Sequence, residues 1–68
     1  MTVGAQLKQT LAALQGARGT LRVYAGQARE EEARKAYGQG VQELDAVIGD
    51  LEARLRALEM EEPQYKGL

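Results

Sequence analysis

The chain of 68 residues contains no cysteine, histidine, tryptophan, phenylalanine, serine or asparagine. Zinc-finger ligand sets need Cys or His, and nucleophilic triads pair Ser or Cys with His, so the composition excludes these sites and any disulfide framework. Carboxylates, Lys, Tyr and Thr remain for chemistry. We therefore expect a protein that is not an enzyme and that binds no cofactor.

Long apolar runs are also absent. No stretch approaches the roughly 20 consecutive apolar residues that span a bilayer. The start, Met1-Thr2-Val3-Gly4, lacks the basic and apolar regions of a signal peptide. We expect a cytoplasmic protein with no membrane insertion.

The size allows one domain, and its core is expected to be small. A chain of 7.4 kDa lies below the size at which a single core is usually self-sufficient. Leu, Ile, Val and Phe together number 14 of 68 residues, which is just above the fraction of roughly 20% below which chains are disordered. The composition therefore predicts a fold of marginal stability.

Charge is distributed unevenly along the chain. Residues 1–29 carry four bases and no acid, whereas residues 30–68 carry ten acids and five bases. The net charge of −1 hides this asymmetry. We expect the two halves to pair with each other.

Apolar residues in the first half recur at spacings of three, four and seven, which predicts a helix over about residues 3–26. Thr2 is placed to cap its first turn. The second half has a stronger pattern, which predicts a helix over about residues 30–61 that begins at three glutamates and ends before Pro63. The two stripes consist of Leu7, Leu11, Leu14, Leu21, Ala25 and Ala28, and of Tyr37, Val41, Leu44, Ile48, Leu51, Leu55 and Leu58.

A turn over about residues 27–29, with Gly26 ending the first helix, predicts an antiparallel helical hairpin followed by a tail at 62–68. If the chain reverses near residue 28, residue i faces residue 57 − i. This register places Lys8 near Asp50 and leaves Leu55 and Leu58 on an overhang of about a dozen residues. The other expected facing pairs are Leu21 with Tyr37, Leu14 with Leu44, and Leu7 with Leu51.

The predicted fold class is all-α, a two-helix hairpin that forms a homodimeric four-helix bundle. Two helices that share one seam of alanines and scattered leucines bury little apolar surface, so self-association is the simplest way to complete the core. The residues expected in the core or the dimer interface are Leu7, Leu11, Leu14, Leu21, Tyr37, Val41, Leu44, Ile48, Leu51, Leu55 and Leu58.

Two alternatives to a protein-interaction role stay open. Glu30–Glu32, Glu43 and Asp45 allow a carboxylate metal site in a ferritin-like bundle, although such sites pair Glu with His and this chain has no His. An RNA-binding hairpin dimer would use the bases of the first half, Lys8, Arg22 and Arg29. Nucleic acid is the weaker expectation, because the acids of the second half offset these bases.

Five residues in the half of the hairpin near the predicted turn have expected structural roles. Arg18 and Arg34 fall at seam positions, where each either binds an anion inside the bundle or packs its stem and extends its charge to solvent. Gly40 allows a close approach of the helices. Tyr24 and Tyr37 are expected to pack at the edge and centre of the stripe, with their hydroxyls at the surface.

The sequence Gly38-Gln39-Gly40 is similar to part of a phosphate-binding loop. No strand precedes it, so we do not interpret it as one.

The C-terminal segment is a candidate partner-binding tail. Pro63 ends the second helix and an aromatic residue, Tyr65, follows two positions later. Tyr65 either folds back over Leu55 and Leu58 or belongs to an extended peptide offered to a partner. The tail residues are Glu61, Glu62, Pro63, Gln64, Tyr65 and Lys66.

The opening 2–11, the central 32–37 and the closing 58–66 with its Glu-Glu-Pro-Gln-Tyr-Lys ending resemble a small uncharacterised bacterial family, a domain of unknown function of spore-forming Gram-positive bacteria. The resemblance implies an accessory role near spore-germination genes, in the forespore or the spore, and names no catalytic residue. We therefore expect a non-enzymatic, oligomerising interaction protein.

Overall fold

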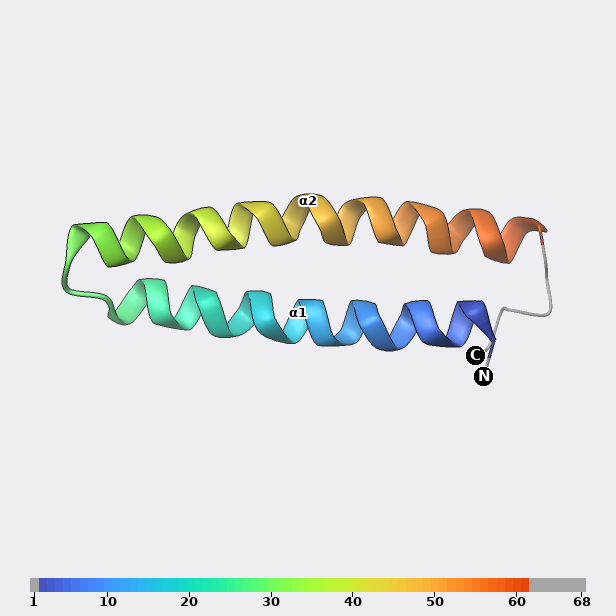
Figure 1. Cartoon of the computed structure of the whole chain (residues 1–68), viewed down its shortest axis with the longest axis horizontal. Helices are drawn as coiled ribbons and strands as arrows, with labels where there is room; N and C mark the ends of the chain where they lie inside the picture. The colour runs from blue at the N-terminus through green and yellow to red at the C-terminus, as the bar shows by residue number, and fades with distance from the viewer. Residues whose placement is uncertain (1, 62–68) are drawn as a thin grey trace.

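The computed structural model describes residues 2–61, which form two antiparallel helices side by side (Figure 1). Helix α1 spans Val3–Gln27 and helix α2 spans Glu31–Glu61. The molecule measures 48 × 17 × 13 Å. Between residues 2 and 61 there is no strand, which confirms the all-α class and the hairpin.

Thr2 caps the N-terminus of α1, as predicted. Its backbone is extended, with φ −79° and ψ 162°, and its hydroxyl oxygen accepts a hydrogen bond from the amide of Ala5 at 3.1 Å. The carbonyl of Thr2 accepts from the amide of Gln6 at 3.0 Å. The first of these bonds pairs an amide that a helix N-terminus otherwise leaves free, and the second is the first backbone hydrogen bond of the helix.

Helix α1 ends one residue past the predicted bound of about 26, so Gly26 lies inside it. Helix α1 continues through Gln27, and the amide of Ala28 still donates to the carbonyl of Tyr24 at 2.9 Å. The chain leaves the helix at Ala28 by turning to an extended conformation (φ −67°, ψ 131°). No left-handed residue is needed for this exit, and Gly26 therefore stays helical.

Arg34 holds the short connection against the start of α2. One guanidinium nitrogen donates to the carbonyl oxygen of Ala28 at 3.2 Å, and the other donates to the carboxylate of Glu31 at 3.0 Å. The Arg34 amide donates to the carbonyl of Glu30 at 3.0 Å. Arg34 thus acts at the turn with an exposed side chain, rather than inside the seam.

The predicted register is wrong. Lys8 pairs with Glu59 at 4.0 Å, whereas Asp50 accepts a hydrogen bond from Arg54 of its own helix. The ring of Tyr37 contacts Tyr24, and Leu21 lies against Gly40. The predicted numbers of facing residues add up to 57, whereas those of Tyr24 and Tyr37 add up to 61 and those of Lys8 and Glu59 to 67, so these partners lie further along α2 than predicted.

The corrected register removes the overhang expected for α2. Glu59 lies beside Lys8 in the second turn of α1, so the last turns of α2 run alongside the first turns of α1. Leu55 and Leu58 are half-buried there, contrary to the expectation that they lack an intrachain cover.

The contact between the helices buries few apolar side chains. Leu11 and Ile48 are the buried large hydrophobic residues of the described segment, at 6% and 2% exposure. The other expected core residues are half-buried, namely Leu7, Leu14, Leu21, Tyr37, Val41, Leu44, Leu51, Leu55 and Leu58. The seam therefore covers one strip of each helix and leaves the leucines beside it partly open to water.

Gly40 permits a close approach, as predicted. A Cβ atom at this position would lie 3.0 Å from the Cδ1 atom of Leu21. At Gly49 a Cβ atom would meet nothing within 4 Å. Gly40 and Gly49 thus differ in what a methyl group would encounter.

This difference predicts that two alanine substitutions change the free energy of unfolding by unequal amounts. Gly49→Ala should raise the free energy of unfolding by about 0.5–1 kcal/mol, because alanine is the better helix former and has open space there. Gly40→Ala should gain clearly less, because Leu21 must move. Urea unfolding followed by circular dichroism at one chain concentration measures both; an equal gain at the two sites would contradict the close approach.

Candidate interaction surfaces

Leucines spaced seven residues apart line one side of each helix. Seven residues are close to two helical turns, so residues at this spacing follow one side of a helix. Leu21 of α1 lies against Gly40, which precedes Leu44 of α2 by one turn. The two rows therefore share one side of the hairpin, which we name the leucine face: Leu7, Leu14, Leu21, Leu44, Leu51 and Leu58.

A row of polar residues follows directly after the leucines in sequence. Sequence neighbours are separated by about 100° around a helix, so these residues lie on the other side of the seam. In α1 they are basic or neutral, and in α2 all three are acidic. With Arg18 they form what we name the charged face: Lys8, Gln15, Arg18, Arg22, Asp45, Glu52 and Glu59.

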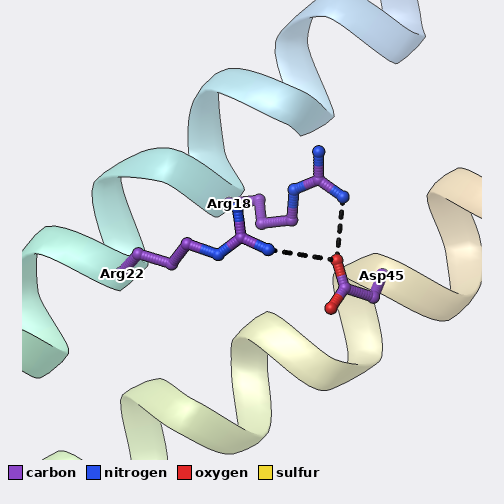
Figure 2. Close-up of polar contacts among 3 residues, drawn as sticks. All are labelled: Arg18, Arg22 and Asp45. Carbon is purple, nitrogen blue, oxygen red and sulfur yellow. Dashed lines mark hydrogen bonds and ion pairs between the residues drawn. The ribbon is translucent and has the colours of Figure 1, made fainter.

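Ion pairs cross the seam on the charged face. Asp45 of α2 accepts a hydrogen bond from Arg18 at 2.8 Å, and the guanidinium of Arg22 lies 3.7 Å from the same carboxylate oxygen (Figure 2). Lys8 and Glu59 form a further cross-helix pair near the open end. Each joins a base of α1 to an acid of α2, which confirms that the two halves pair by charge.

The arginine pair on Asp45 contributes more to register than to stability. The Arg18 side chain is 25% exposed and that of Asp45 is 46% exposed. Ion pairs this open to water contribute about 0–1 kcal/mol. Arg18 thus extends its charged group to the surface, the simpler of its two predicted roles, and its carboxylate partner fixes how α1 and α2 align.

The two tyrosines pack together near the connection, at the edge and centre of the stripe as predicted. Their ring centroids are 5.6 Å apart and the planes are tilted by 59°. Tyr24 is exposed and Tyr37 is half-buried. They contribute to an open hollow of about 410 Å³ whose lining consists of Tyr24, Gln27, Ala28, Arg29, Glu30, Ala33 and Tyr37.

The residues of the two alternative functions are not gathered into a site. Lys8 and Arg22 lie against acids of α2, while Arg29 lies in the connection at the other end from Lys8. Within residues 2–61 no group of three or more Asp or Glu side chains is placed to hold a metal ion. Neither α1 nor α2 contains a stretch long and apolar enough to cross a bilayer.

Most of the predicted tail lies outside the described residues. Glu61 is the last residue of α2 and is exposed. Glu62, Pro63, Gln64, Tyr65 and Lys66 belong to the part of the chain that the structure does not describe. The two roles expected for Tyr65 stay predictions.

The acidic row of α2 is the feature that sequence reasoning missed. From the sequence, Asp45 is expected only as a metal ligand, and Glu52 and Glu59 contribute only to the acidic charge of the second half. The signal is present in the sequence, because each leucine at the seven-residue spacing is followed by Lys, Gln or Arg in α1 and by Asp or Glu in α2. This pattern separates a polar side from an apolar side in both helices.

A family model described as a protein of unknown function (DUF1657) matches residues 7–55. This range contains α1 from Leu7 onward, the connection and most of α2. No curated protein and no solved structure matches the chain.

Two aspartates of α2 allow a matched test of the charged face. Asp45→Asn should lower the free energy of unfolding by about 1 kcal/mol in low salt, because Asp45 faces two arginines of α1. Asp50→Asn removes a pair with Arg54 of the same helix and should cost only about 0.3–0.5 kcal/mol.

Urea midpoints at low salt and at 1 M salt measure both losses, and salt should reduce the larger one most. Equal losses for the two variants, or a loss at Asp45 that salt leaves unchanged, would show that the cross-helix pairs stabilise the hairpin no more than a pair within one helix.

Proposed function

The chain belongs to the DUF1657 family of proteins of unknown function, and we propose that it is a non-enzymatic helical protein that forms a homodimeric four-helix bundle and acts by binding protein partners. Each protomer contributes one hairpin. The absence of Cys, His and Ser from the sequence supports a role without covalent or metal chemistry.

The incomplete core is the observation that carries this proposal. Only Leu11 and Ile48 are buried among the large apolar residues of the described chain. The accessible surface is 4906 Å², whereas a compact monomer of this mass exposes about 4,200 Å². The difference reflects the elongated shape of the hairpin, 48 × 17 × 13 Å, in which each helix has one neighbour.

The free energy of folding also favours a dimer. Hydrophobic burial is the main favourable term in folding, and the half-buried leucines of the hairpin realise only part of it. A second hairpin that covers them removes apolar surface at about 25 cal/mol per Å². Dimerisation and folding are therefore coupled in this proposal, as in many obligate dimers.

Further parts of the proposal rest on the sequence. The segment 61–66 is proposed as a partner-binding tail on the strength of Pro63 and Tyr65. An accessory role in sporulation or germination rests on the family resemblance alone.

Solution mass across a dilution series tests the proposal. Light scattering should give a mass about twice 7.4 kDa, and helicity followed by circular dichroism should fall as dilution converts dimer to monomer, because one hairpin buries too little surface to stay folded. A chain that stays monomeric and fully helical at every concentration would contradict the proposal.

A further inference from the structure

The exposed large hydrophobic residues are concentrated beside the leucine face. Val3 lies one turn before Leu7, Tyr24 lies one turn after Leu21, and Val47 lies one turn after Leu44. Residues three or four apart share a side of a helix. These three side chains are 47–57% exposed, and they widen the leucine face into one apolar surface over both helices.

The remaining two exposed hydrophobic residues lie elsewhere. Val23 and Met60 are each two residues from the nearest leucine of the face, which corresponds to about 200° around the helix. Val23 is 55% exposed and Val47 is 47% exposed. The chain thus offers one exposed valine on the leucine face and one away from it.

The charged face is the less favourable surface for a second copy. Docking there would remove Arg18, Arg22 and Asp45 from water, and desolvating such groups often costs more than their mutual attraction returns. Their ion pairs are already formed within one hairpin. The leucine face has less of this penalty, because its central side chains are aliphatic and the charged Arg54, one turn after Leu51, is 69% exposed beside them.

The rims of the leucine face differ in charge between the helices. The residues that directly precede its leucines are Gln6, Ala13 and Thr20 in α1, and Glu43, Asp50 and Ala57 in α2. The rim of α1 is therefore uncharged, and the rim of α2 carries Glu43 and Asp50, of which Asp50 is paired with Arg54. If α2 of one copy lay against α2 of the other, the Glu43 carboxylates of both copies would lie in one interface, which like charges disfavour.

We propose that a second copy of this chain docks on the leucine face with the two-fold axis parallel to the helices, so that α1 of each copy lies over α2 of the other. This inference rests on the proposed function and names its partner surface and geometry. The acidic rim of each α2 then meets an uncharged rim, both turns lie at the same end of the bundle, and both charged faces point outward.

Two valine substitutions test which face is used. Val47→Glu places a charge in the interface without touching the buried seam, so the dimer dissociation constant should rise at least tenfold. Val23→Glu is the matched control, equally open in the hairpin, and should leave the constant within about twofold of the unchanged chain. Sedimentation equilibrium measures all three proteins.

The outcomes separate the two proposals. A dimer that survives Val47→Glu, or that weakens equally with Val23→Glu, overturns the leucine face while leaving self-association intact. An unchanged chain that is a folded monomer removes the proposed function itself, and the docking geometry with it.

A single spin label at the turn tests the orientation. The chain has no cysteine, so Arg29→Cys gives one label per copy in the connection. Turns at the same end should give a label separation of about 30 Å or less, since packed helices lie 8–10 Å apart. A separation near the 48 Å length of the hairpin would place the turns at opposite ends and overturn the parallel axis.

Discussion

A pair of helices shares a single line of contact, and this constraint governs the molecule. Leu11 and Ile48 lie on that line and are buried. The leucines beside this line of contact, such as Leu14 and Leu51, are half-buried. Within the described chain no further helix lies over them. The hairpin therefore resembles half of a four-helix bundle, in which each helix has two neighbours instead of one.

The seven-residue repeat gives the hairpin two unlike sides. Because sequence neighbours are about 100° apart on a helix, a leucine followed by a charged residue places apolar and polar groups on opposite sides of the seam. Repetition of this dipeptide in both helices produces the leucine face and the charged face. Opposite charges in the two helices, as in Arg22 and Asp45, then select how the helices align.

The sequence was sufficient for the elements and insufficient for their alignment. Spacings of three and four residues located both helices, and the Thr2 cap followed from its position before the first apolar residue. The register is wrong because the spacing along each helix does not show which residues of the two helices face one another. The exit through Ala28 needs no left-handed residue and moves the helix end by only one residue, whereas Lys8 pairs with Glu59, nine residues beyond the expected Asp50.

All six residues of the leucine face are among the predicted core residues, but the sequence does not distinguish them from the residues buried between the two helices. Leu11 and Leu14 belong to the same amphipathic stripe, and spacing alone does not show which of them faces the partner helix. The cross-helix pairs of Arg18 and Lys8 supply that distinction, since they fix the side of the seam that is polar. Burial in the folded hairpin then identifies the strip that is still uncovered.

Small-angle X-ray scattering tests most directly the claim that a second hairpin completes the core side by side. The account predicts a particle with twice the mass of one chain and an unchanged length, set by the 48 Å hairpin, because the second copy adds to the thickness. A particle with the mass of one chain would contradict it. A doubled mass with a length much greater than 48 Å would contradict it equally, because the copies would then meet end to end.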